Sequence, residues 1–285
     1  MDNTLLFDND FVKRLNNMKI AMKTKSNTNL MGGRKSNAKG SSVEFSDYRE
    51  YALGDDLRRV DWNAYGRFDK VYIKLFSEER EGIFNIFLDT SESMNYGEKP
   101  KKNMALYVAA GIIYIVLNSL DRAALHLIKD GELNIAKGKT GRANYYKMLQ
   151  DLEQIEFSKS AGLTKAILQY PFKYKGVSVI ISDFYEIDDL EDALKYLKFK
   201  KQEIILVRIL SKEEIEPELT GALNFIDCEN DKNSYKVDVD STLISDYHKA
   251  YKSFNEKLSA LALKYQANLI MVSSEDSFEK VLMRL

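Results

Sequence analysis

Residues 83–94 read Ile-Phe-Asn-Ile-Phe-Leu-Asp-Thr-Ser-Glu-Ser-Met, an apolar run that ends in a carboxylate followed by two spaced hydroxyls. The length and composition of the apolar part are typical of one buried strand in a parallel sheet. Asp89, Ser91 and Ser93 then occupy alternate positions in the loop that follows. Carboxylate and hydroxyl oxygens are hard ligands, so this loop suits Mg²⁺, Mn²⁺ or Ca²⁺ better than zinc or copper.

The rest of the chain alternates strands and helices around this run. Alternation of side chains predicts a strand at residues 71–76, and apolar runs predict further strands at 123–128, 177–182, 203–210 and 268–272. Hairpins are expected to pair 123–128 with 133–136 and 223–228 with 235–239. Helical spacing predicts helices at residues 101–119, 143–155, 163–170, 190–199 and 241–265. The order of strand, loop and helix predicts an α/β fold, with a mostly parallel central sheet and helices on both faces.

Composition excludes several classes of protein. The chain has 285 residues, a net charge of −1 and 30% charged residues, which argues against a nucleic-acid-binding protein. Its single Cys228 cannot form an internal disulfide, and the placement of His126 in a predicted strand favours a core role over a ligand role. These features predict a cytoplasmic protein. The longest apolar run, residues 104–117, is shorter than the roughly 20 residues that a membrane span needs, so no integral membrane segment is expected.

The amino-terminal segment is locally basic. Residues 11–40 contain eight Lys or Arg residues and no Asp or Glu. Apolar side chains recur there at helical spacing, at Phe11, Leu15, Met18 and Met22. Two interpretations stay open for this amphipathic helix: it packs on the body of the protein, or it makes weak contact with an anionic membrane surface.

Two residues from later parts of the chain complete the predicted set of oxygen ligands. Asp183 follows the strand predicted at residues 177–182, and Thr164 lies at the start of the helix predicted at residues 163–170. Because ligands in open α/β sheets bind beyond the carboxyl ends of the strands, both are expected near Asp89. Five hard ligands with two carboxylates would leave a metal ion able to attract an external acidic oxygen, which is a binding device and not a reaction. In the structural alternative, Ser91 and Ser93 only cap the next helix and Asp89 braces the loop.

These residues resemble two known families. Asp89-Thr90-Ser91-Glu92-Ser93 is similar to the Asp-x-Ser-x-Ser signature of the metal-ion-dependent adhesion site in von Willebrand factor type A domains, and Thr164 and Asp183 stand where that family has its later threonine and aspartate. A second, longer match is to the signature of the bacterial "domain of unknown function" family numbered fifty-eight, carried by Arg49-Glu50-Tyr51, Gly54-Asp55-Asp56-Leu57-Arg58-Arg59-Val60-Asp61-Trp62 and Gly66-Arg67.

The resemblance implies an organisation and a partner. It implies a signature extension packed on the main domain at residues 43–80 and a Rossmann-like von Willebrand A-like domain at 81–285, whereas composition predicts a basic arm with a Gly- and Ser-rich connection at 1–42. It also implies work as an adaptor or assembly factor beside an AAA+ ATPase of MoxR type, and contact with another protein that offers an acidic ligand residue. Within the signature block, Asp55 or Asp56 is expected to cap a short helix. Leu163 departs from the family pattern, which often has glycine there.

Two enzyme readings remain as alternatives. An aspartate after a first strand is also how phosphohydrolases of the haloacid-dehalogenase type present their nucleophile, which would be Asp89, but these enzymes need a second acid or threonine where Ser91 stands. A nucleotide-binding loop at Gly138-Lys139-Thr140 would need glycine at position 133, which is leucine. The prediction is therefore a non-enzymatic, metal-dependent binding module.

Overall fold

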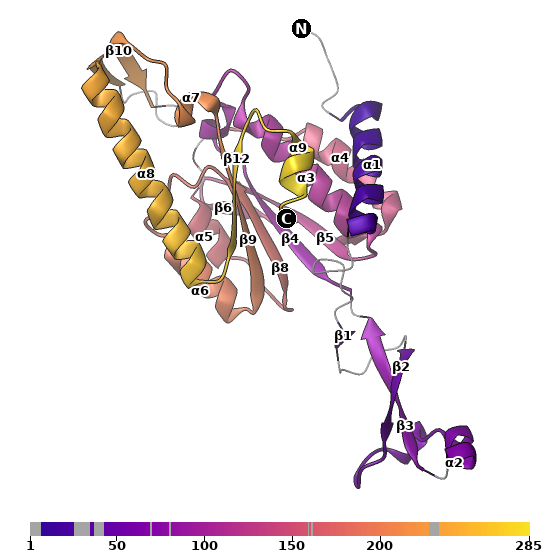
Figure 1. Ribbon diagram of the computed structural model, residues 1–285. Helices are drawn as coiled ribbons and strands as arrows, with labels where there is room; N and C mark the ends of the chain where they lie inside the picture. The colour runs from indigo at the N-terminus through magenta and orange to yellow at the C-terminus, as the bar shows by residue number, and fades with distance from the viewer. Residues whose placement is uncertain are drawn as a thin grey trace. The chain divides into compact units, whose positions relative to one another are not determined.

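The computed structural model describes residues 7–25, 35–36, 43–68, 70–79, 81–158, 160, 162–227 and 234–285. The chain forms two compact units, both drawn in Figure 1. The small unit is Lys23–Glu81, and the main unit joins Met1–Met22 to Gly82–Leu285. The first helix of the chain therefore belongs to the main unit as far as Met22.

The main unit is built around a seven-stranded sheet (Figure 1). Its path runs β12-β9-β8-β4-β5-β6, and β7 also pairs with β5. The bounds are β4 (Ile83–Asp89), β5 (Arg122–Lys129), β6 (Glu132–Asn134), β7 (Lys139–Thr140), β8 (Gly176–Ser182), β9 (Gln202–Leu210) and β12 (Asn268–Ser273). The strands from β12 to β5 are parallel, whereas β6 and β7 run antiparallel to β5. The predicted α/β fold with a mostly parallel sheet is confirmed.

Helices cover both faces of this sheet and enclose one apolar cluster on each (Figure 1). On one face lie α1 (Asn9–Lys25), α3 (Lys101–Asn118), α4 (Tyr145–Glu153) and α9 (Phe278–Leu282). On the other lie α5 (Leu163–Leu168), α6 (Leu190–Phe199) and α8 (Ser241–Lys264). Burial on two sides explains why all seven residues of β8 are buried and why its sequence, Gly-Val-Ser-Val-Ile-Ile-Ser, has no charged side chain.

The amphipathic helix α1 packs on the main unit. Phe11, Leu15 and Met18 are buried, and the Phe11 ring lies 5.3 Å from the ring of Tyr107 and 4.9 Å from that of Phe278, measured between centroids. The packing interpretation of this helix is therefore correct for these three side chains, and that of Met22 lies outside the described side chains. In the part of the chain that the structure describes, no helix has the length and apolar character that crossing a membrane requires.

The segment after β9 carries a short helix and a separate hairpin. Helix α7 (Lys212–Ile215) is followed by β10 (Gly221–Ile226) and β11 (Ser234–Val239), which pair antiparallel as predicted. Cys228 lies between them, outside the described residues. The long helix α8 follows, and its start is capped by Asp240, whose carboxylate accepts the backbone N–H of Leu243 at 2.8 Å.

The small unit is a three-stranded antiparallel sheet. Its order is β1-β3-β2, with β1 (Lys35–Ser36), β2 (Val43–Glu50) and β3 (Tyr72–Glu79). A 3₁₀ turn, η1 (Leu57–Arg59), and a short helix, α2 (Trp62–Phe68), lie between β2 and β3. The sequence predicted β3 but not β2, because β2 reads Val-Glu-Phe-Ser-Asp-Tyr-Arg-Glu and is too rich in charges to show a buried face.

A buried polar cluster lies within the main sheet. His126 is fully buried on β5, its Nδ1 accepts the backbone N–H of Ala136 at 3.3 Å, and its Nε2 lies 3.2 Å from Asn85 Oδ1. The hydroxyl of Tyr170 donates to the same Asn85 oxygen at 2.9 Å. Burial lowers the pKa of His126 to about 4, so the imidazole is neutral at pH 7. This histidine is a core residue, as its place in a predicted strand indicated.

Candidate functional site

The predicted site lies where β4 and β8 end. These neighbouring strands are parallel, and Leu88 on β4 is paired with Ile181 on β8. The next residue along each strand is therefore Asp89 on one side and Ser182 on the other. Their side chains meet at the carboxyl end of the sheet, where open α/β folds place their ligands.

Asp89 is almost fully buried, with 1% of its surface exposed, and both of its oxygens accept hydrogen bonds. Oδ2 accepts the Ser182 hydroxyl at 2.6 Å, and Oδ1 accepts the backbone N–H of Ser91 at 2.9 Å. Burial and the negative charge of Asp183 raise the pKa of Asp89 to about 6, although the bonds from Ser182 and Ser91 act in the opposite direction. The two carboxylates thus interact across the site.

The two serines of the loop face each other. Ser91 Oγ lies 2.9 Å from Ser93 Oγ, and Ser91 is fully buried. Ser91 occupies the N-cap position of the 3₁₀ turn η2 (Glu92–Asn95), but its side chain makes no cap bond, and the N-cap of α3 is Pro100. The capping part of the structural alternative is therefore wrong. Asp89 does brace the loop, through the N–H of Ser91.

Thr164 lies at the second position of α5. Its hydroxyl oxygen is buried and has no hydrogen-bond partner among the described residues, so no bond joins it to the other four predicted ligands. The backbone N–H of Leu163 donates to Glu186 Oε2 at 3.3 Å, which links the start of α5 to the loop that begins with Asp183. Gly162 just before it has φ +59°, and a Cβ there would lie 2.5 Å from the backbone nitrogen of Gly131. That position therefore requires glycine.

Asp183 is held by a lysine that the sequence did not predict. Lys101, the first residue of α3, is fully buried, and its ammonium donates to Asp183 Oδ2 at 2.8 Å and to Glu214 Oε1 at 2.7 Å. Burial lowers the pKa of Lys101, but the charges of Asp183 and Glu214 outweigh it and leave the pKa raised, so the group is cationic at neutral pH. The sequence did not single out Lys101, because Lys99 and Lys102 lie close to it and the three lysines look alike in the sequence.

Glu214 and Arg208 extend this charged cluster. Glu214 belongs to α7, where its other carboxylate oxygen accepts the backbone N–H of Ser211 at 2.7 Å and Ser211 Oγ accepts the N–H of Glu214 in return. Arg208 on β9 is 1% exposed, and its Nε donates to the backbone carbonyl of Asp183 at 3.0 Å. The cluster therefore holds three carboxylates, those of Asp89, Asp183 and Glu214, and two cations.

The donor set fits a hard divalent ion. Asp89 and Asp183 supply carboxylate oxygens, the two serines supply hydroxyls, and the buried hydroxyl of Thr164 has its bonding capacity unused. A site made by His, Cys or three acids does not fit: within the described ranges, no group of three or more His, Cys, Asp or Glu side chains is placed to hold a metal. The predicted ligands are instead two acids and three hydroxyls, which are oxygen donors of the type that hard divalent ions prefer.

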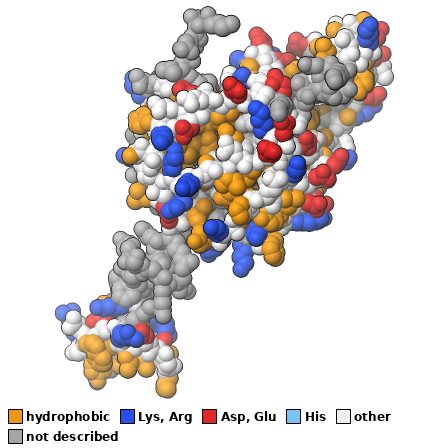
Figure 2. All heavy atoms as spheres, turned by 180° about the vertical axis from the view of Figure 1, so that it is seen from behind, with side chains coloured by type: hydrophobic (Ala, Val, Ile, Leu, Met, Phe, Trp, Pro, Cys, Tyr) orange, Lys and Arg blue, Asp and Glu red, His pale blue; other side chains and the backbone are white. Residues whose placement is uncertain are grey.

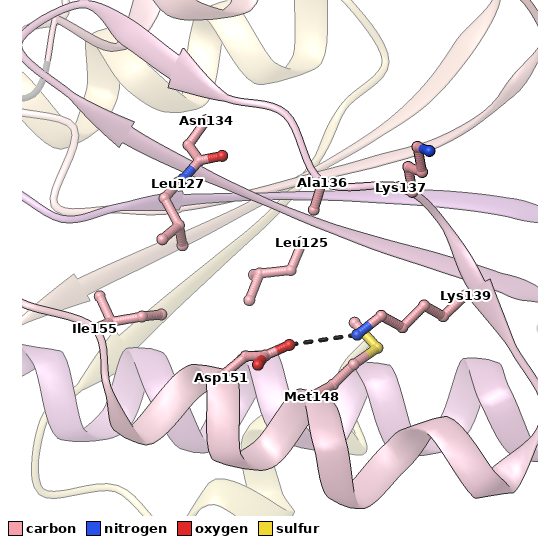
Figure 3. A pocket seen from close by; sticks show the side chains of 9 residues that line it. All are labelled: Leu125, Leu127, Asn134, Ala136, Lys137, Lys139, Met148, Asp151 and Ile155. Carbon is pink, nitrogen blue, oxygen red and sulfur yellow. Dashed lines mark hydrogen bonds and ion pairs between the residues drawn. The ribbon is translucent and has the colours of Figure 1, made fainter.

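Two hollows lie beside β5 and α4. The first, shown in Figure 3, is a cavity of about 120 Å³ between β5, the segment after β6 and helix α4, lined by Leu125, Leu127 and Met148 among others. An ion pair of 3.3 Å between Lys139 and Asp151 lies at its side. The second, of about 550 Å³, shares part of this lining and reaches Thr90. None of the five predicted ligands lines either hollow.

The acidic residues of the signature block have structural roles within the small unit. Asp55 accepts two bonds from the Arg49 guanidinium, at 2.8 and 2.9 Å, and Asp56 caps η1, as the prediction for this block required. Asp61 accepts the N–H groups of Asn63 and Ala64 at the start of α2. Large apolar side chains of the block are exposed instead, namely Leu53, Leu57, Trp62 and Tyr65. Figure 2 shows hydrophobic side chains gathered at the tip of this unit.

The sequence matches one family over most of its length. The profile of the family "Protein of unknown function DUF58" matches residues 47–257. Uncharacterized proteins of Mycobacterium bovis and Mycobacterium tuberculosis are each 24% identical over 223 residues, which covers 76% of this chain and 70% of the relative.

Solved structures of low sequence identity align with the chain. The conserved hypothetical protein BatB from Bacteroides thetaiotaomicron aligns at 13% identity with a TM-score of 0.46, covering 70% of this chain and 95% of that one. The SpRpn10 VWA domain aligns at 13% identity with a TM-score of 0.40, covering 72% and 94%.

Proposed function

The chain belongs to the DUF58 family of proteins of unknown function, and we propose that it is a non-enzymatic protein-binding module with a divalent metal site at the ends of β4 and β8. The observation that carries the proposal is the convergence of Asp89 and Asp183. Both side chains are buried, and the negative charge of Asp183 raises the pKa of Asp89. Two buried carboxylates in one site are stabilised by a cation that lies between them.

The residues that would hold the ion are Asp89, Ser91, Ser93, Thr164 and Asp183. Their oxygens favour Mg²⁺, with Mn²⁺ or Ca²⁺ as substitutes. When bound, the ion would supply a positive charge able to accept one further oxygen ligand. The residues of the chain orient the donors, because Ser182 and the backbone of Ser91 fix the Asp89 carboxylate.

The charges of the cluster favour an acidic partner once an ion is present. Three carboxylates against Lys101 and Arg208 give a net charge of about −1, which would repel an acidic side chain. A divalent ion would change the sign of this balance. We therefore propose a partner protein that offers an Asp or Glu side chain, recognised only when the ion is bound.

The partner that we propose is an AAA+ ATPase of MoxR type, with the chain acting as its adaptor or assembly factor in the cytoplasm. The support for this partner is the resemblance of the signature block in residues 49–67. In the small unit that block exposes Leu53, Leu57, Trp62 and Tyr65, which offers apolar surface for a second contact.

The test is calorimetric titration of Mg²⁺ and Mn²⁺ into the wild-type protein and into Asp89→Asn, which keeps the size of the buried side chain. Asp151→Asn is the matched control, because Asp151 lines the cavity and not the proposed site. We expect binding by the wild type and by Asp151→Asn, and none by Asp89→Asn. Equal heats in all three proteins would exclude the site.

The partner is tested by capture of a MoxR-type ATPase on the immobilised chain in Mg²⁺ and in EDTA. We expect the wild-type chain to retain the ATPase in Mg²⁺ but not in EDTA, and Asp89→Asn to retain it in neither. Hydrolysis of a generic phosphoester that disappears in Asp89→Asn would instead support the phosphohydrolase alternative, in which Asp89 is the nucleophile.

A further inference from the structure

Lys101 places a permanent cation inside the candidate site. Its side chain has no exposed surface, and its ammonium lies 2.8 Å from Asp183 Oδ2 and 2.7 Å from Glu214 Oε1. A buried ammonium is tolerated only when anionic groups surround it, so these two bonds account for its position. Asp183 is one of the two carboxylates proposed to hold the ion.

The location of Lys101 is not explained by the stability of its helix. It is the first residue of α3, and the positive end of the helix dipole disfavours a cation there. The lysine instead occupies an anionic site made by two elements far away in the sequence, the end of β8 and the helix α7. A solvent-exposed lysine at this position would avoid the cost of burial.

We propose that Lys101 is a resident cation of the site, which neutralises Asp183 in place of a divalent ion and so lowers the affinity of the site for that ion. This inference rests on the proposed function, because it concerns the same carboxylates. An ion that shares Asp183 Oδ2 with the ammonium is repelled by it, and a metal-free site remains neutralised in part and stably folded.

Two substitutions should change ion affinity in opposite directions. Lys101→Met removes the competing charge and leaves three carboxylates, so we expect Mg²⁺ to bind at least about tenfold more tightly than to the wild type. Glu214→Gln leaves Asp183 as the only anionic partner of the ammonium, so we expect weaker Mg²⁺ binding. Lys102→Met is the matched control: it makes the same charge change one residue along the helix, and we expect wild-type affinity.

The experiment is titration of Mg²⁺ into the four full-length proteins by calorimetry, with thermal unfolding in EDTA and in Mg²⁺. We expect Lys101→Met to have a lowered Tm in EDTA that rises with Mg²⁺ by several degrees more than that of the wild type. If the ion pairs of Lys101 were purely structural, Lys101→Met would lower the Tm without tightening Mg²⁺ binding.

The outcomes separate this inference from the proposed function. If the wild type binds Mg²⁺ and Lys101→Met binds it with equal or lower affinity, the inference is overturned and the proposed metal site still stands. Binding by Lys101→Met alone supports the inference and overturns metal dependence in the wild type, whereas no binding by either overturns both. If Lys101→Met does not fold, unchanged or tighter binding by Glu214→Gln overturns the inference.

Discussion

The hydroxyl of Ser182 donates a 2.6 Å hydrogen bond to Asp89 Oδ2 and thereby joins the ends of two neighbouring strands. The same hydroxyl oxygen accepts the backbone N–H of Phe184 at 3.0 Å. Phe184 is buried and has φ +58°, a conformation that a bulky residue adopts only when its surroundings enforce it. Ser182 therefore positions both Asp89 and the loop that starts with Asp183.

Replacement of Ser182 by alanine should destabilise the fold more than an ordinary buried serine does. The change leaves a buried carboxylate oxygen without its donor, so we expect the free energy of unfolding to fall by about 1.5–3 kcal/mol, measured by urea denaturation. Ser178→Ala is the control, because Ser178 is equally buried on β8 but donates to the neutral amide of Gln202 at 3.2 Å. Equal losses in the two variants would contradict the role given to Ser182.

The packing of α1 can be tested at Leu15. This side chain is 1% exposed, and its truncation to alanine should lower the free energy of unfolding by about 2–4 kcal/mol through lost apolar burial and a cavity. Lys13→Ala on the exposed side of the helix should change it by less than about 0.5 kcal/mol. Flotation of the wild type with anionic vesicles, together with a Leu15→Ala variant of unchanged stability, would favour the membrane interpretation.

The strands that carry the site could be predicted from the sequence because each is a short apolar run buried on both faces. The run before Asp89 and the run before Asp183 are of this kind, and both form strands in the structure. Since parallel strands end at the same edge, their following residues had to lie near each other. The convergence of the two carboxylates therefore follows from the order of the elements.

The charged partners of the site could not be predicted, because they depend on contacts distant in sequence. Lys101 meets Asp183 across 82 residues and Glu214 across 113 residues. No local pattern distinguishes Lys101 from the lysines beside it, and Glu214 reads as an ordinary capping-box residue of a short helix. Strand β2 was missed for a related reason: it is held by antiparallel backbone pairing with β3, and its own sequence shows no apolar face.

The buried His126 should make the fold sensitive to acid. Burial lowers its pKa to about 4, from 6.5 in the unfolded chain, so between these values the unfolded state binds more protons. Stability should therefore fall as the pH drops from 6.5 to 4, by up to about 3 kcal/mol from this group. Urea denaturation at pH 7 and pH 4.5 measures the change.

Two variants isolate this contribution. His126→Gln should change the difference in stability between the two pH values in favour of pH 4.5, by the amount assigned to this group, because no imidazole remains to be protonated on unfolding. His248→Gln, at an exposed position of α8, should keep the wild-type difference. A wild-type slope in His126→Gln would assign the acid sensitivity to other groups.

Ion binding at the proposed site should weaken below pH 6. Burial and the charge of Asp183 raise the pKa of Asp89 to about 6, and a protonated carboxyl cannot serve as an anionic ligand. A proton therefore competes with the ion, and we expect Mg²⁺ affinity to fall about tenfold between pH 7.5 and pH 5, measured by calorimetry.

Without an ion, the stability of the fold depends on pH in the opposite direction. A carboxyl whose folded pKa is raised favours the folded state at low pH, and this contribution is lost as the pH rises through 6. Asp89→Asn should remove that contribution, and an affinity that stays constant down to pH 5 would exclude Asp89 as the titrating ligand.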